Sequence, residues 1–162
     1  MRELFLGDVM FLKRIVDLRD EYELTQDDMA KILGVSQSNY GRWELDDNFI
    51  PLNHLNNLCN YFKVSMDYMI GITDERNYKD VNPKLNKILI GRRLKAFRSK
   101  YNLTQTELAK LFNTSPSTLS AYETGKVRLL TAFAYAIVKK YNVSLDFLCG
   151  RIDEEPELKK SK

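Results

Sequence analysis

Leu24-Thr25-Gln26 recurs farther along the chain as Leu103-Thr104-Gln105, at an offset of 79 residues. The same offset, held without a gap, aligns Val64-Ser65-Met66-Asp67 with Val143-Ser144-Leu145-Asp146. Further matches at this offset are Ala30-Lys31 with Ala109-Lys110, Ser36 with Ser115, Glu44 with Glu123, and Gly71 with Gly150. Because the matches cover a whole unit without an insertion, they indicate a duplicated domain.

Each unit is predicted to fold into five short helices, because its apolar residues recur at helical spacing. The clearest helix start lies at the repeated tripeptide, where Thr25 is followed by Asp28 and Thr104 by Glu107. A threonine and an acid three residues apart can form a capping box, in which each side chain accepts a hydrogen bond from the other residue's backbone N–H. We expect the helix that follows to bury three apolar residues in each unit: Met29, Ile32 and Leu33, and Leu108, Leu111 and Phe112.

A tight turn is predicted next, at Gly34-Val35 and at Asn113-Thr114, because Gly and Asn most readily adopt the left-handed conformation at a helix end. Ser36 and Ser115 then cap the third helix. Pro116 falls at the first position of that helix, where a missing N–H costs nothing. Two helices joined in this way form a helix-turn-helix unit. A fourth helix and a short fifth helix complete each unit.

These elements divide the chain into a first helix-turn-helix domain at residues 1–72, a polar linker at 73–83, a second domain at 84–152 and a charged tail at 153–162. The predicted fold class is all-α. The composition, 44% hydrophobic and 29% charged, is typical of globular proteins. No apolar stretch is long enough to cross a bilayer, and the first residues do not resemble a signal peptide. We therefore expect a cytoplasmic protein without a membrane partner.

The sequence offers no set of residues for catalysis or metal binding. Its two cysteines, Cys59 and Cys149, form no Cys-x-x-Cys pair and are expected to be reduced and buried. With His54 as the only histidine, no zinc site is predicted. There is no nucleophile–base set and no Gly-rich phosphate loop. We therefore predict a protein that is not an enzyme, with no cofactor and no small-molecule ligand evident.

Charge is distributed unevenly along the chain. Residues 1–75 contain 14 acidic and 7 basic residues, whereas residues 76–162 contain 8 acidic and 18 basic residues. The modest net charge of +3 for the whole chain conceals this difference. The basic half suits a polyanion such as nucleic acid, and the asymmetry indicates that the two halves do different work.

The repeated residues, in this order and spacing, resemble the Cro/C1-type repressor family, also called the xenobiotic-response-element type. The pattern is Leu-Thr-Gln, Ala-Lys, a tight turn, Ser-Gln-Ser, an aromatic residue before Glu, and Val-Ser-x-Asp. The resemblance covers nearly the whole chain, twice. It implies two tandem five-helix domains of lambda-repressor-like fold, each placing its third helix in the major groove of double-stranded DNA. It also implies that two arginine–glutamate pairs fix the first helix against the third: Arg19–Glu44 and Arg98–Glu123.

The same resemblance implies particular DNA contacts. Gln26 and Gln105 would contact phosphates. In the first unit, the third helix would present five residues to the DNA: Ser36, Gln37, Ser38, Asn39 and Arg42. Glutamine can pair bidentately with adenine, and arginine with guanine. In the second unit, the expected contacts are Ser115, Ser117 and Thr118 on the third helix, and Lys126 and Arg128 in the loop that grips phosphate. The neighbouring aromatics, Trp43 and Tyr122, are instead predicted to pack in the core.

The two units differ at these positions. Pro116 replaces Gln37 and Ala121 replaces Arg42, so the second unit keeps no long bidentate reader. Its loop, however, reads Thr124-Gly125-Lys126, and its first helix is rich in basic residues, among them Arg92, Arg93, Lys95, Arg98 and Lys100. The first unit has the acidic sequence Leu45-Asp46-Asp47-Asn48 in that loop, which is unfavourable beside a phosphate backbone.

Two interpretations follow. In the favoured one, both units bind DNA, with specificity weighted to the first and affinity to the second, since base contacts specify and phosphate contacts position. In the other, only the basic unit binds DNA, and the acidic unit docks a partner or forms a dimer.

The predicted function is a sequence-specific transcriptional regulator, a repressor of the phage or mobile-element type. The alternative is a protein-interaction module. The resemblance also implies a homodimer that pairs through the last helices, and two sets of residues are candidates for that surface: Met66, Tyr68, Met69 and Ile70, or Phe147, Leu148 and Cys149. Core packing is the plainer explanation for most of these residues.

Overall fold

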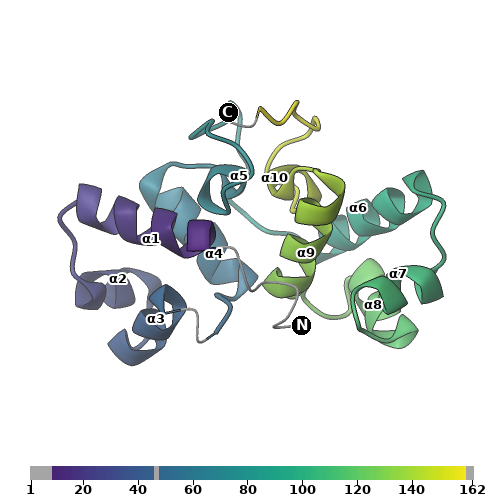
Figure 1. The fold of residues 1–162 in the computed structure, drawn as a ribbon, viewed down its shortest axis with the longest axis horizontal. Helices are drawn as coiled ribbons and strands as arrows, with labels where there is room; N and C mark the ends of the chain where they lie inside the picture. Colours follow the sequence, from purple (N-terminus) through teal and green to yellow (C-terminus); the bar gives the residue numbers. More distant parts are fainter. Residues whose placement is uncertain (1–8, 46–47, 160–162) are drawn as a thin grey trace. The chain divides into compact units, whose positions relative to one another are not determined.

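A computed structural model describes residues 9–45 and 48–159, and all the regular elements among them are α-helices. The chain forms two compact units whose main segments are Gly7–Tyr78 and Lys79–Glu157. The first contains α1 (Val9–Glu21), α2 (Gln26–Leu33), α3 (Gln37–Glu44), α4 (Leu52–Phe62) and α5 (Met66–Met69). The second contains α6 (Lys87–Lys100), α7 (Gln105–Leu111), α8 (Pro116–Glu123), α9 (Thr131–Tyr141) and α10 (Leu145–Leu148) (Figure 1). The predicted all-α fold with two helix-turn-helix units is confirmed.

The predicted helix ends are confirmed by their backbone geometry. Thr25 and Asp28 form a capping box at α2, and Thr104 and Glu107 form the same box at α7. At the turn before α3, Gly34 has φ +67° and is left-handed, and Asn113 has φ +51° at the matching place before α8. Serine side chains accept a hydrogen bond at the start of the third and fifth helices of both units: Ser36, Ser115, Ser65 and Ser144.

Each unit has its own apolar core, and two predicted core positions are wrong. Met29 and Leu33 are buried on α2, but Ile32 is 39% exposed, and its counterpart Leu111 is 43% exposed. Successive residues of a helix are about 100° apart around its axis. The buried stripe of α2 therefore centres between Met29, Ala30 and Leu33, about 110° away from Ile32. Because α7 repeats this geometry, Leu111 is exposed for the same reason. Apolar identity alone does not distinguish the two sides of so short a helix.

Other predicted core residues are buried. Trp43 and Tyr122 lie within the cores of their units, and both cysteines are buried and form no disulfide. The residues considered for a dimer surface are largely inside as well: Met66, Met69, Ile70, Leu148 and Cys149 are at most 3% exposed. Only Tyr68 and Phe147 of that set are partly exposed. The plainer explanation, core packing, therefore holds for most of the set.

An arginine in the first helix of each unit, which sequence analysis did not single out as structural, ties that helix to the end of the fifth. Arg14 donates hydrogen bonds to the carbonyl oxygens of Tyr68 and Thr73, the latter at 2.6 Å. Arg93, 79 residues later, donates to the carbonyls of Phe147 and Ile152. Each guanidinium also lies 4.3 Å from the centre of the aromatic ring in that fifth helix. Buried carbonyls thereby obtain donors that a helix end itself lacks.

The segment expected to be a linker, residues 73–83, is divided between the two units. Arg14 and Asp74 form an ion pair of 2.7 Å, and the Tyr78 hydroxyl donates to the buried Asp67 carboxylate at 2.9 Å. From Lys79 onward the chain belongs to the second unit, where the Asn82 N–H donates to the Arg151 carbonyl. Within the described residues, no helix combines the length and apolar character that a bilayer span requires.

The expected arginine–glutamate pairs join the first helix to the third in both units. Arg98 Nε donates to Glu123 Oε1 at 2.5 Å, and the Glu123 side chain is only 3% exposed. Burial alone would raise the pKa of Glu123, but hydrogen bonds from Arg98 and Gln105 outweigh it and hold the pKa below its ordinary value. Glu123 therefore stays ionised at neutral pH, as the partner that Arg98 requires.

We predict that Arg98→Met destabilises the second unit by about 3 kcal/mol, because it leaves a buried carboxylate without its cation. Urea unfolding followed by helical circular dichroism measures this, with Arg92→Met, an exposed residue of the same helix, as the matched control. Fluorescence of the single tryptophan, Trp43, reports separately on the first unit.

The same substitution makes a prediction about pH. A depressed carboxyl pKa contributes stability that is present above its ordinary value of 4.5 and is lost as pH falls through the folded pKa. The stability difference between the wild type and Arg98→Met should therefore shrink in acid. A difference that is the same at neutral pH and in acid would contradict the role given to the ionised Glu123.

Candidate nucleic-acid interface

The third helix of the first unit has one polar exposed face. Four of the predicted contact residues lie exposed along it: Gln37, Ser38, Asn39 and Arg42. The other side of α3 is buried through Tyr40 and Trp43. Ser36 is also exposed, and its hydroxyl oxygen accepts the Asn39 N–H at 3.2 Å as the helix cap. The structure therefore brings the predicted residues of this helix together on one accessible surface.

Gln26 joins this surface to the buried ion pair. Its Nε2 donates to Glu44 Oε2 at 2.8 Å, and its Oε1 accepts from Gln37 Nε2 at 2.9 Å. Arg19 holds the other oxygen of Glu44 at 2.7 Å. An ionised carboxylate only accepts hydrogen bonds, so Glu44 requires the NH₂ side of the Gln26 amide to face it. The amide oxygen of Gln26 must then face Gln37.

This chain of contacts depends on Glu44 being ionised. Burial raises the pKa of Glu44, but hydrogen bonds from Arg19 and Gln26 lower it, and the net pKa is below the ordinary value. Space for Gln26 comes from Gly41, where a Cβ would lie 3.3 Å from the Gln26 Oε1. The sequence alone predicted Gln26 and Gln37 as separate contacts. It did not predict the hydrogen bond from Gln37 to Gln26. That bond orients the Gln37 amide and uses one hydrogen of its NH₂ group, while the Gln37 amide oxygen remains available on the exposed surface.

The second unit keeps the inner part of this chain and lacks the outer part. Gln105 Nε2 donates to Glu123 Oε2 at 2.8 Å, as Gln26 does to Glu44. Pro116 occupies the position that Gln37 has in the first unit. The Gln105 amide oxygen therefore has no side-chain amide at that position to donate a hydrogen bond to it. The three predicted hydroxyl residues bond among themselves instead. Ser115 Oγ lies 3.0 Å from Ser117 Oγ and 2.9 Å from Thr118 Oγ1.

The loop after α8 presents two exposed cations, Lys126 and Arg128. Gly125 has φ +69°, and a Cβ there would lie 2.8 Å from the Cα of Ile88, so only glycine fits this close approach to the start of α6. Leu129 is buried and anchors the far end of the loop. In the first unit, Asp46 and Asp47 of the corresponding acidic loop lie outside the described residues.

Part of the basic charge predicted for α6 has an internal role. Arg93 and Arg98 are partly buried and bonded within their unit. Arg92, Lys95 and Lys100 are exposed on the same helix. The exposed positive charge of this unit therefore includes these three residues and the loop after α8. Among the described residues, no group of three or more His, Cys, Asp or Glu side chains is placed to hold a metal ion.

Two family models match the chain at separate places. A helix-turn-helix domain model covers residues 13–74, and a helix-turn-helix model covers residues 94–148. The uncharacterized HTH-type transcriptional regulator YobD of Bacillus subtilis is 33% identical over 80 residues, which are 49% of this chain and 71% of that protein. An uncharacterized HTH-type transcriptional regulator of Archaeoglobus fulgidus is 36% identical over 63 residues, 39% of this chain and 90% of that one. No solved structure matches the chain.

A further relative is antitoxin PezA of Streptococcus pneumoniae, which is 38% identical over 62 residues, 38% of this chain and 39% of the antitoxin. The two matched models fall on the two structural units, and each includes the predicted turn and the third helix. The chain belongs to the DNA-binding helix-turn-helix transcriptional regulators of the Cro/C1 type, with the domain present in two tandem copies.

Proposed function

We propose that this regulator binds specific double-stranded DNA sites as a repressor, with its first unit reading bases and its second unit supplying most of the affinity. The proposal rests on one observation, the Gln37–Gln26–Glu44–Arg19 chain of side-chain contacts in the first unit. It orients a long bidentate side chain at the start of the third helix, where this fold faces base edges. Repression then follows from simple occlusion of the site.

The chemistry of Gln37 suits adenine. Its Nε2 uses one hydrogen on Gln26, which leaves the second hydrogen and Oε1 for the N7 and N6 groups of adenine in the major groove. Arg42, five residues farther along α3, suits guanine by a bidentate contact. A well-made pair of this kind contributes about 1–3 kcal/mol against the wrong base. Ordering Gln37 before binding lowers the entropic cost of that contact.

The second unit suits phosphate. Lys126 and Arg128 are exposed on a loop fixed by Gly125 and Leu129, next to the third helix. At the start of α8, the predicted DNA contacts are short hydroxyl side chains: Ser115, Ser117 and Thr118. Short hydroxyls and cations make phosphate contacts, which position a protein on DNA without specifying sequence. Gln105 contributes a phosphate contact in this proposal, and Gln26 does so in the first unit.

A second candidate function is docking of a protein partner by the acidic first unit. Two observations favour it: the 14 acidic against 7 basic residues in residues 1–75, and the relative that carries the name antitoxin. A homodimer is part of either proposal. Because most of the apolar residues of α5 and α10 are buried, the dimer interface would have to be formed by other residues.

Selection of bound fragments from a random DNA pool tests the leading proposal. The full-length protein should enrich a defined motif near physiological salt. Gln37→Ala/Arg42→Ala should broaden or weaken that motif, because it removes both long base readers of the first unit. Asn57→Ala, an exposed residue of α4, serves as the control and should leave the motif intact. An unchanged motif in the double variant would move base reading to the second unit, and the absence of any motif would favour the docking function.

The duplication supplies a matched pair for the orienting role of Gln26. Gln26→Ala and Gln105→Ala each remove the same bond to a buried glutamate and the same proposed phosphate contact. Only Gln26→Ala also frees Gln37. We therefore expect both variants to bind more weakly, and only Gln26→Ala to lose discrimination, by about tenfold at the adenine position. Equal discrimination in the two variants, measured by competition with single-base mismatches, would contradict the orienting role.

Salt dependence tests the phosphate role of the second unit. Each phosphate contact contributes about −0.9 to the slope of log K against log salt. Lys126→Ala/Arg128→Ala should therefore make the slope less steep by about 1.8. Lys139→Ala/Lys140→Ala, on exposed residues at the end of α9, changes net charge equally. A matching loss of slope in this control would show that overall charge, and not the loop, determines affinity.

A further inference from the structure

Each unit ends in a short segment that passes over the first and fifth helices, here called the strap: residues 74–78 in the first unit and 153–157 in the second. An ion pair joins each strap to the end of its unit's first helix. In the first unit it is Glu21 on the helix with Arg76 on the strap, at 2.5 Å. At the same offset in the second unit it is Lys100 on the helix with Glu155 on the strap, at 3.5 Å. The charges are inverted at both positions.

The first strap is held firmly. The Ser65 N–H donates to the Arg76 carbonyl at 2.5 Å, and the Ser65 hydroxyl donates to the Glu75 carbonyl at 3.2 Å. Arg76 donates two hydrogen bonds to Glu21, and its guanidinium lies 5.5 Å from the centre of the Tyr68 ring. Backbone and side chain of this strap therefore both contact the surface between α1 and α5.

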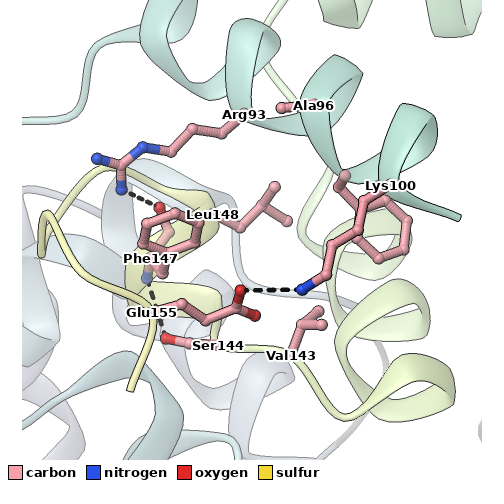
Figure 2. Close-up of a pocket in the computed structure, with 9 residues that line it drawn as sticks. Arg93, Ala96, Lys100, Val143, Ser144, Phe147, Leu148 and Glu155 are labelled. Carbon is pink, nitrogen blue, oxygen red and sulfur yellow. Dashed lines mark hydrogen bonds and ion pairs between the residues drawn. The ribbon is translucent and has the colours of Figure 1, made fainter. Parts of the chain in front are cut away.

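The second unit has a pocket of about 240 Å³ at the corresponding place, between α6 and α10. Its walls are apolar: Ala96, Phe97, Val143, Phe147 and Leu148. Lys100 and Glu155 reach towards each other across it (Figure 2). The Lys100 side chain is 64% exposed and that of Glu155 is 34% exposed. An ion pair this long and this exposed contributes little to stability, so another carboxylate can replace Glu155 at small cost.

The other cation of the pocket is already committed. Arg93 donates to the carbonyls of Phe147 and Ile152 and lies against the Phe147 ring. Lys100 is therefore the cation that an incoming anion would meet. Glu155 shows which kind of ligand the pocket suits, because its carboxylate pairs with the Lys100 ammonium and its side chain is a short apolar chain. The rest of the pocket is lined mainly by aromatic and aliphatic side chains.

We propose that this pocket binds a small apolar carboxylate, whose carboxylate takes the place of Glu155 on Lys100 and whose apolar body fills the space between α6 and α10. The pocket lies near the lower limit of ligand sites, which are about 300–1,000 Å³, so the ligand has on the order of ten non-hydrogen atoms. Binding releases the second strap from Lys100. This proposal does not depend on the DNA-binding function.

Titration of the isotopically labelled full-length protein with phenylacetate, followed by amide chemical shifts, tests the proposal. Phenylacetamide is the matched probe, since it has the same ring and no charge. We expect saturable shifts confined to α6, α10 and the second strap, with a Kd of about 1–10 mM. Phenylacetamide should bind about tenfold more weakly or not at all. Equal binding of the two probes, or shifts spread over both units, would overturn the proposal.

Substitutions of exposed residues separate the two parts of the site without disturbing the core. Glu155→Gln removes the internal competitor and should tighten phenylacetate binding about threefold, whereas Lys100→Met should weaken it about tenfold. Glu21→Gln breaks the corresponding strap ion pair of the first unit and should leave the Kd unchanged. The proposal is contradicted if Lys100→Met binds phenylacetate as tightly as the wild type does, or if Glu155→Gln does not change the affinity.

Discussion

One buried carboxylate at the end of the third helix organises each unit. Glu44 and Glu123 each accept hydrogen bonds from an arginine of the first helix and a glutamine at the start of the second. A buried charge is costly unless it is paired and hydrogen-bonded, so the three helices are held in one arrangement. Since a carboxylate accepts and never donates, it also fixes which way the neighbouring glutamine amide faces. In the first unit that orientation reaches the surface through Gln37. The group that stabilises the domain thus also orients a side chain on the helix proposed to read bases.

Duplication has preserved this interior and changed the surface around it. Arg14 and Arg93 fasten the fifth helices through equivalent carbonyls, and the caps, turns and helix bounds correspond along the chain. Differences appear where the constraint is weaker. Buried Asp67 is bonded by the Tyr78 hydroxyl, whereas its counterpart Asp146 pairs with Arg151. In the strap ion pairs, the helix carries the acid and the strap the base in the first unit, and this arrangement is reversed in the second unit. The residues proposed to face DNA differ most, and this difference is the basis for the proposed division between base reading and phosphate binding.

The parts of the fold that local chemistry determines could be predicted from sequence. Thr25 and Thr104 cap because a threonine and an acid at that spacing satisfy each other, and Gly34 and Asn113 turn because they tolerate positive φ. Features that depend on packing between helices could not be predicted from local sequence patterns. Ile32 and Leu111 follow helical spacing and still lie outside the buried stripe. The roles of Arg14 and Arg93, and the bond from Gln37 to Gln26, join residues that no local pattern pairs. Comparison of the two repeats could have found the arginines, since both positions match at the same offset.

We propose that one unit reads bases while the other binds phosphate. Interference mapping on a single selected DNA fragment tests it most directly, with base methylation and phosphate ethylation compared on the same complex. We expect strong base interference at one half-site, lost in Gln37→Ala/Arg42→Ala. At the other half-site we expect interference from phosphates with little from bases. Base interference of equal strength at both half-sites, or persisting at both in that double variant, would contradict it.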